Sequence, residues 1–194
     1  MVRLNLKLTA SNETVSYNHL HRLTGFLHHR VGENELHDDL SLYSFGWLEG
    51  GQGAEDGDGL AFPLEIKEQE APAFNGSHRF KTDGAPVIAR RYREDGSREY
   101  LLSGEHPEAA AAVMTRVLRR KLAAAGYGEE HTESVAVQFD EMYSHARDKV
   151  ATVKGTDHKG SICPVVVEGT PEAVQFAWTV GAGELTGSGF GALK

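Results

Sequence analysis

The pattern of apolar and polar positions predicts a chain of short strands with two long helices. Residues 2–8 and residues 135–139 alternate apolar and polar side chains, which is typical of a strand with one buried face. Residues 16–30 and residues 107–125 repeat apolar side chains every three or four positions, which predicts amphipathic helices. Pro107 suits the first turn of the second helix, and Ser16 suits the N-cap of the first.

Further strands are expected where apolar and aromatic residues gather between turn residues, namely at residues 40–48, 60–66, 86–93, 98–102, 164–168 and 174–180. Asp95 and Gly96 separate two of these runs, and Asp-Gly is a strong hairpin signal. Each half of the chain therefore combines a helix with several strands. We expect an α+β fold of two tandem ferredoxin-like domains, with a shortened first domain over residues 1–84 and a second domain over residues 85–194.

The last part of the chain is rich in glycine. Five glycines fall within residues 181–191, at Gly181, Gly183, Gly187, Gly189 and Gly191. Glycine allows close approach of another chain, and successive backbone N–H groups can form an anion-binding concavity. No helix follows these glycines, so neither a P-loop nor a dinucleotide-binding fingerprint fits. We expect them, together with Ser188, to form a loop after the final strand that holds the backbone of a polyanion.

The net charge of −8 argues at first against a nucleic-acid partner, but the charge is unevenly distributed. Residues 49–70 carry a net charge of −6, which leaves only −2 for the rest of the chain. A local basic patch decides whether a protein binds a polyanion. Solvated surface charge is the alternative interpretation. The basic residues that we expect to contact nucleic acid are Arg79, Lys81, Arg147, Lys149, Lys154 and Lys159.

Composition also bounds the cellular setting. Cys163 is the only cysteine, which excludes an internal disulfide and fits a reducing compartment. No apolar run is long enough for a membrane span, and the strand expected at residues 2–8 leaves no export signal. We therefore expect a cytoplasmic protein without a membrane partner.

Five of the ten histidines precede Asp38. A metal site is one interpretation, but helical ligand pairs usually lie four residues apart, whereas His21 and His28 lie seven apart. We expect no metal and no cofactor. Acid–base chemistry is the stronger hypothesis, because histidine gives and takes protons near neutral pH and RNA carries its own nucleophile, the 2′-hydroxyl. His28 and His37 could converge on one phosphate; surface or capping histidines are the alternative.

Three groups of residues then suggest a family. The first comprises Tyr17-Asn18-His19, Gly25-Phe26-Leu27-His28, Leu36-His37-Asp38 and Tyr43-Ser44-Phe45; the second comprises Phe74-Asn75-Gly76-Ser77 and Ala85-Pro86-Val87-Ile88. The third and most specific comprises Val180-Gly181-Ala182-Gly183-Glu184 and Gly187-Ser188-Gly189-Phe190-Gly191. In this order, over nearly the whole chain, they resemble the CRISPR-associated repeat-processing endoribonucleases of the RAMP superfamily.

This resemblance implies two ferredoxin-like domains and metal-independent cleavage of precursor CRISPR RNA within its repeats, leaving a 2′,3′-cyclic phosphate and a 5′-hydroxyl. It places the catalytic histidine at His37 and a second acid–base group at His28, with auxiliary roles for Tyr17, Arg22 and His29. The family's lysine shortly after the catalytic histidine is absent, because Asp38, Asp39, Leu40 and Ser41 follow His37. His29, Arg22 or a basic residue of the second domain could replace it.

A second hypothesis stays open at this point: a non-catalytic RAMP subunit that binds guide RNA inside a CRISPR effector complex. The histidine placement favours the nuclease, whereas the missing lysine and the acidic total favour the silent subunit. An unrelated ferredoxin-like regulatory domain would leave the glycine-rich segment unexplained. The expected partner is CRISPR repeat RNA, and other effector subunits are partners under the second hypothesis. The resemblance fits a monomer or a homodimer.

Overall fold

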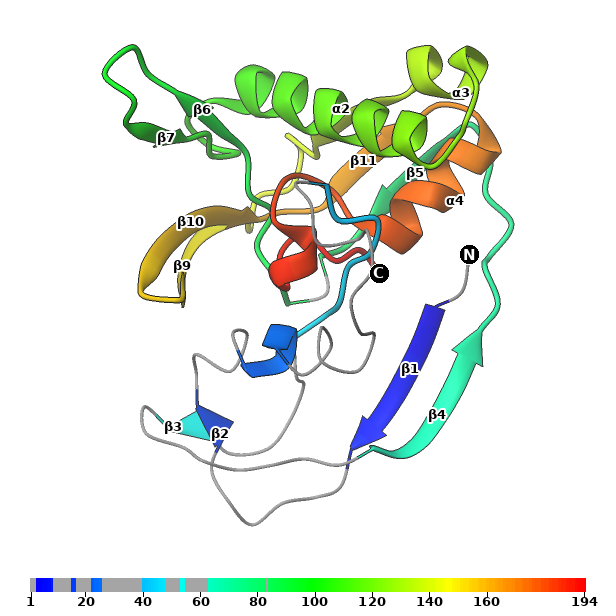
Figure 1. Cartoon of the computed structure of the whole chain (residues 1–194). Coiled ribbons are helices and arrows are strands. Elements are labelled where there is room, and N and C mark those ends of the chain that lie inside the picture. Colours follow the sequence, from blue (N-terminus) through cyan, green and yellow to red (C-terminus); the bar gives the residue numbers. More distant parts are fainter. Residues whose placement is uncertain are drawn as a thin grey trace.

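The computed structural model describes residues 3–8, 15–16, 22–25, 40–47, 53–54, 63–82 and 84–194 (Figure 1). The strands of the first half are β1 (Arg3–Leu8), β2 (Val15–Ser16), β3 (Gly53–Ala54) and β4 (Pro63–Gln69). The second half contains β5 (Ser77–Phe80), β6 (Arg90–Tyr92), β7 (Arg98–Tyr100), α2 (Pro107–Ala124), α3 (Glu129–Ser134), β8 (Ala136–Phe139), β9 (Arg147–Val153), β10 (Thr156–Ile162), β11 (Val165–Glu168), α4 (Pro171–Val180) and the 3-10 turn η2 (Thr186–Ser188).

The second half has the strand order of a ferredoxin-like domain. Strand β11 lies between β5 and β8 and is antiparallel to both. Leu193 pairs antiparallel with Thr82, just beyond β5, and so adds a closing edge on the far side of β5. The chain order β5, α2, β8, β11, α4 and this closing segment is the βαββαβ pattern. The second domain therefore confirms the predicted fold class.

The core of this domain lies between the sheet and the two helices α2 and α4. Helix α2 buries the stripe predicted from its periodicity, including Val113, Met114 and Leu118. The facing residues alternate along the strands, so that Val137 and Phe139 of β8 are buried while Ala136 and Gln138 are exposed. Non-directional burial of these side chains is the main force that holds helices and sheet together.

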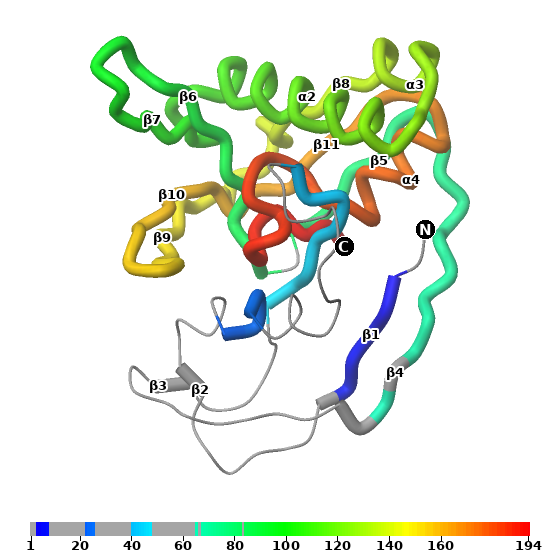
Figure 2. Tube along the Cα trace, in the orientation of Figure 1, coloured from blue at the N-terminus to red at the C-terminus, as the bar shows by residue number. Residues whose placement is uncertain are grey.

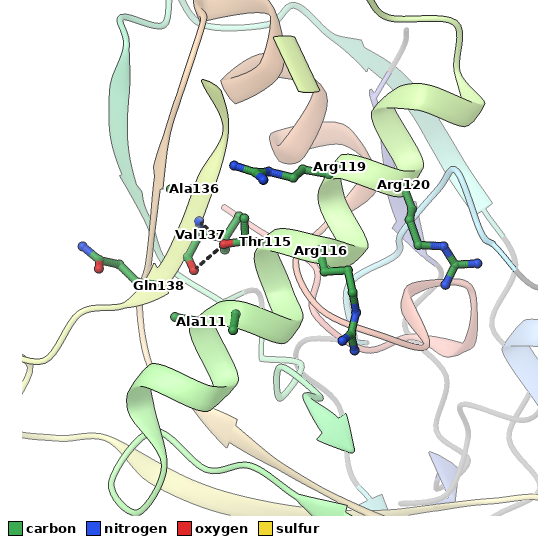
Figure 3. A pocket seen from close by; sticks show the side chains of 9 residues that line it. Ala111, Thr115, Arg116, Arg119, Arg120, Ala136, Val137 and Gln138 are labelled. Atoms are coloured by element: carbon green, nitrogen blue, oxygen red, sulfur yellow. Dashed lines mark hydrogen bonds between the residues drawn. The ribbon is translucent and has the colours of Figure 1, made fainter. Parts of the chain in front are cut away.

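The outer edge of the sheet is covered by side chains of α2. Thr115 Oγ1 accepts from the N–H of Val137 (2.9 Å) and donates to its C=O (3.2 Å) (Figure 3). The Arg119 guanidinium donates to the C=O of Val135. An open strand edge would otherwise present these groups to other chains. Helix α2 therefore stabilises β8 by its side chains as well as by its apolar stripe.

Two hairpins extend from the second domain. The hairpin β6–β7 turns at Asp95 and Gly96, as predicted from the sequence, and Gly96 has a φ of 78°. The hairpin β9–β10 was not predicted, because its strands carry charged residues among the apolar ones. Its inner face packs Ala151 and Val153 against Phe190, which is fully buried. This contact joins β9–β10 to the glycine-rich segment.

The described elements of the first half form small sheets. Strands β1 and β4 pair antiparallel, with Leu6 opposite Ile66, and β2 pairs in parallel with β3. The strand predicted at residues 2–8 is confirmed, but its expected buried face is wrong, since Leu4 and Leu6 are 56% and 47% exposed. In the part of the chain that the structure describes, no layer of side chains covers these two leucines.

The strand predicted at residues 174–180 is wrong, because these residues belong to helix α4. Thr170 caps the helix by accepting a hydrogen bond from the N–H of Ala173, and Pro171 occupies its first turn. Gln175 and Thr179, four positions apart, form a narrow polar side, while Phe176, Ala177 and Trp178 are buried. Val174, Phe176, Trp178 and Val180 also fit a period of two, so this short run did not distinguish a helix from a strand.

The predictions for residues 16–48 are corrected where the structure describes them. Ser16 lies in β2 and not at a helix N-cap, and residues 22–25 are helical. Residues 40–47 contain no strand; they run as an irregular segment beside the red glycine-rich segment in Figure 2. No helix among the described residues is long and apolar enough to cross a membrane.

Candidate nucleic-acid interface

Residues 181–191, the glycine loop, connect α4 to the closing edge of the second sheet. The sequence placed this loop after a final strand; its true position is between a helix and a final strand-like segment. The loop is pinched at its base, where the N–H of Ala182 donates to the C=O of Gly191 (2.9 Å). Gly181 has a φ of 77°, and a side chain there would lie 2.6 Å from the C=O of Gly191. Glycine is required at this crossing.

Most of the glycine loop is buried, and its amides bond within the chain. The N–H of Glu184 donates to the C=O of Ile88 (2.8 Å), and that of Gly191 donates to the C=O of Pro86 (3.0 Å). These groups, with that of Ala182, are therefore not the anion-binding N–H groups that glycine content suggests. Ser188 is half-buried and Glu184 is partly exposed. RNA contact by the glycines and Ser188 stays a prediction.

The glycine loop supports residues 40–47, which we call the docked segment. Ser44 Oγ donates to the C=O of Thr179 (3.0 Å), and Trp47 Nε1 donates to the C=O of Gly189 (2.6 Å). Tyr43 OH donates to the C=O of Gly187 (3.3 Å), and burial raises the pKa of this phenol. Because Thr179 lies in the last turn of α4, its carbonyl needs a partner from outside the helix. The docked segment supplies it.

Among the glycines of the loop, Gly187 is the one where an added side chain would come nearest to the docked segment. It lies in η2 with an ordinary backbone conformation, and an added Cβ would come within 2.8 Å of Ser41 Cβ and 3.1 Å of Tyr43 Cζ. Glycine is needed here because of its missing side chain, whereas Gly181 also needs a positive φ. Ser41 follows the predicted catalytic residue His37 by four positions, so the contact lies close in sequence to the catalytic link, our name for His37 and the residues that connect it to the docked segment.

A cation of the second domain lies on the docked segment. Lys149 Nζ of β9 sits 3.5 Å from the ring centroid of Trp47, a cation–π contact. Partial burial and the nearby Arg147 lower the pKa of Lys149. Arg147, Lys149, Ala151 and Val153 share the inner face of the β9–β10 hairpin, so the two basic residues continue the row that packs on the loop. Arg147 is exposed.

The other basic residues named from the sequence lie elsewhere. Lys159 is on the outer face of the hairpin, 3.4 Å from Asp148, and Lys154 is in its turn. Arg79 is paired with Asp140 (2.6 Å). Lys81 is exposed, and its backbone pairs with that of Lys194. The structure therefore brings Lys149 to the docked segment, with Arg147 on the same face of the hairpin, but does not gather all six basic residues there.

Lys121 holds the loop from the opposite side and was missed as a functional residue. Its side chain is 2% exposed; Nζ donates to Thr186 Oγ1 (2.7 Å) and to the C=O of Val180 (3.2 Å). Burial lowers the pKa of this amine to about 7. Lys121 lies at a position of the α2 stripe where an apolar residue is expected. A lysine at such a position could have indicated from the sequence that it is buried. Trp47 and Tyr43 carried no such signal in the sequence.

A groove of about 500 Å³ lies between α2 and β8, away from the docked segment's bonds. It is lined by small side chains and by Arg116, Arg119 and Arg120. Figure 3 shows Arg119 reaching toward the start of β8, while Arg116 and Arg120 point away from it. Arg119 donates to the C=O of Glu133 in α3 and of Val135, just before β8. The groove is basic, but one of its arginines is committed to the sheet edge.

The predicted catalytic residues lie mostly outside the described residues. His28, His37, His29 and Tyr17 all fall there, and Arg22 is exposed in the helical turn at residues 22–25. Among the residues that the structure describes, no three His, Cys, Asp or Glu side chains are grouped as metal ligands. Cys163 is buried, and burial raises the pKa of its thiol, which is typical of a structural cysteine.

Comparison with solved structures shows the same fold in RAMP proteins. A RAMP protein described as binding different RNA substrates is similar over 100% of this chain and 99% of its own, with a TM-score of 0.77 and 15% identity. A CRISPR associated protein Cas6 has a TM-score of 0.73 and 16% identity, with coverage of 100% and 98%. A Cas6-related protein from Pyrococcus furiosus has a TM-score of 0.67 and 15% identity, with coverage of 100% and 96%.

These likenesses confirm the α+β fold of two tandem ferredoxin-like domains. No curated protein matches the sequence. The family model of CRISPR associated protein Cas6, C-terminal, matches residues 66–194, which is more than half of the chain and includes the glycine loop, Lys121 and Lys149. The chain therefore belongs to the family of CRISPR associated protein Cas6.

Proposed function

We propose that the protein is an endoribonuclease that cuts precursor CRISPR RNA within its repeats without a metal ion. The 2′-hydroxyl attacks the adjacent phosphate, the 5′-oxygen leaves, and the products carry a 2′,3′-cyclic phosphate and a 5′-hydroxyl. His37 and His28 are the acid–base pair, one removing the 2′-hydroxyl proton and the other protonating the leaving oxygen. Tyr17, Arg22 and His29 are auxiliary groups. The part of the chain before β5 then carries the acid–base groups, and the second half, from β5 onward, holds the RNA.

One observation supports this assignment most directly: the segment that follows His37 is docked on the glycine loop, with Lys149 stacked on its Trp47. Cleavage needs a cation beside the phosphate, because negative charge grows on it in the transition state. The chain has no lysine just after His37. Lys149 is a basic residue of the second domain that contacts the docked segment, and we assign this role to it, with Arg147 holding the neighbouring backbone.

The test uses RNA of the repeat from the source organism's own CRISPR array, incubated with the protein in EDTA. A matched RNA carries a single 2′-deoxy nucleotide at the cut position found with the first RNA. Cleavage of the first RNA, survival of the second and a cyclic-phosphate end support the proposal. Cleavage of the deoxy RNA, or cleavage that requires added metal, would overturn the mechanism.

The second candidate is a non-catalytic RAMP subunit that binds guide RNA in an effector complex. The residues after His37 favour it, because Asp38 and Asp39 place negative charge where the family carries a lysine. Tight binding of the repeat RNA with no cleavage, over hours and at any pH from 6 to 9, would establish this candidate instead of the nuclease.

A further inference from the structure

We infer that the glycine loop is a positioning element for the catalytic link, and that Gly187 fixes the position of the docked segment through Ser41. This inference rests on the proposed function, in which His37 acts on the RNA. It assigns a role to the loop besides RNA contact: the loop sets the place of the residues that follow His37, and so sets the rate of cleavage more than the affinity.

Among the described residues, the side-chain hydrogen bonds between the docked segment and the glycine loop all have their donors in the docked segment. Ser44, Tyr43 and Trp47 each donate a side-chain hydrogen bond to a carbonyl of α4 or of the glycine loop. The described residues of the docked segment belong to no sheet or helix, so a ladder of backbone bonds does not hold them. The conformation of the docked segment therefore depends on the shape of the loop surface beneath it.

The loop itself is held from behind, which makes it a firm support. Lys121 bonds Thr186, the residue before Gly187, and Phe190 is fully buried against the ring of His158, with 5.5 Å between centroids. The amide of Glu184 is tied to Ile88. Because these contacts fix the loop, a side chain added at Gly187 should displace Ser41 and the docked segment and leave the loop in place.

Gly187→Ala is the sharp test, because the backbone at Gly187 accepts alanine and the new methyl would meet Ser41. We expect the single-turnover rate at saturating protein to fall ~10- to 100-fold, since displacing a catalytic group by about 1 Å has effects of this size. The Kd for a 2′-deoxy repeat RNA should stay within ~threefold. Gly128→Ala is the matched control, because a methyl there meets nothing within 4 Å.

Rescue separates positioning from general damage. Ser41→Gly removes the side chain that the new methyl would meet, so the double variant S41G/G187A should cleave within ~threefold of S41G alone. Tyr43 Cζ lies 3.1 Å from the new methyl and has to shift by only a few tenths of an ångström, much less than Ser41. An additive loss in the double variant, or a rate in G187A equal to that of wild type, would overturn the inference.

A readout without cleavage keeps this inference distinct from the proposed function. The chain has two tryptophans, so ¹⁵N spectra contain two indole signals, and W47F assigns the one from Trp47. G187A should shift the Trp47 signal, which reports the bond to Gly189, and leave that of the buried Trp178 in place. S41G/G187A should restore it. If the wild-type protein does not cleave but these shifts occur, the nuclease proposal is wrong and the inference about Gly187 stands. Unchanged indole signals in G187A would overturn the inference that Gly187 positions the docked segment.

Discussion

The two halves of the molecule are held in different ways. The second half encloses an apolar core between its sheet and the helices α2 and α4, in which Phe80, Phe176 and Leu122 are almost fully buried. In the first half, Leu4 and Leu6 of β1 are exposed. Arg3 instead reaches across to the second half, where it stacks on Trp178 (4.6 Å) and donates to the C=O of Leu193.

This difference indicates that the described parts of the first half are positioned by their contacts with the second half. Side-chain bonds to backbone carbonyls, at Arg3, Ser44 and Trp47, join the halves. Each such bond contributes about 1 kcal/mol, far less than a buried aromatic core residue. Stability should therefore reside mainly in the second half, while the precision of the proposed catalytic link should reside in the contacts between the halves.

The largest expected effect is in the core of the second half. Phe176→Ala removes a ring that is 1% exposed and packs edge-on against Tyr127 (5.2 Å between centroids). We expect the free energy of unfolding, measured in urea, to fall by about 3–5 kcal/mol, because the ring leaves a cavity. A loss below about 1 kcal/mol would show that this core does not dominate stability.

The next effect concerns the buried amine behind the glycine loop. The pKa of Lys121 is about 7 in the folded chain, and an ordinary lysine titrates near ~10.4 when unfolded. Between these values the unfolded chain holds a proton that the folded chain lacks, so the free energy of unfolding should rise as the pH goes from 7 to 10. Urea titrations should show a smaller rise for Lys121→Met. An equal rise in both proteins would refute the assignment.

The hairpin β9–β10 offers a matched pair of lysines. Lys149 lies on the inner face over Trp47, whereas Lys159 lies on the outer face beside Asp148. Lys149→Gln should lower the single-turnover cleavage rate by about 10²-fold, because it removes the cation assigned to the transition-state charge. It should also raise the Kd for repeat RNA about five- to tenfold near 0.1 M salt and reduce the slope of log Kd against log salt by about 0.7, one phosphate contact. Lys159→Gln should change none of these values by more than ~twofold. Equal effects would place the RNA on the outer face instead.

The smallest effect is expected on the exposed face of β1. Leu6→Ser replaces a side chain that is already 47% exposed, so the free energy of unfolding should change by less than about 0.5 kcal/mol. The measurement is the same urea titration as for Phe176→Ala, in parallel. A loss of 2 kcal/mol or more would mean that Leu6 is buried by a partner or another part of the protein in solution.

Much of the second half could be predicted from sequence because its signals are local. Pro107 and the periodic stripe marked α2, and Asp95-Gly96 marked the β6–β7 turn. The prediction for α4 was wrong because the apolar residues Val174, Phe176, Trp178 and Val180 alternate as in a strand, although Gln175 and Thr179 share one side of the helix. The strand predicted over the docked segment was wrong for a different reason. Its aromatic residues are positioned by hydrogen bonds to carbonyls about 140 residues further along the chain, and no local sequence pattern predicts such a distant partner.

The candidate site was also predicted only in part from the sequence. Its glycine loop was visible as composition, but the burial of that loop was not, because glycine content is equally high in a loop that binds a ligand and in one that another segment crosses closely. Lys149 was named as one basic residue among several, and its contact with Trp47 depends on a hairpin that the sequence did not reveal. Lys121 was not named among the candidate residues, although it is buried behind the glycine loop.

The central claim is that the first half supplies the acid–base groups and the second half binds the RNA. Its most direct test is the rate of repeat-RNA cleavage by His37→Ala as a function of protein concentration. The plateau gives the cleavage rate and the midpoint gives the affinity. We expect the plateau to fall by about 10²- to 10⁴-fold, as for loss of a general acid–base group, while the midpoint stays within ~threefold because the second half holds the RNA. A normal plateau for His37→Ala, or a midpoint that moves with an unchanged plateau, would contradict the account.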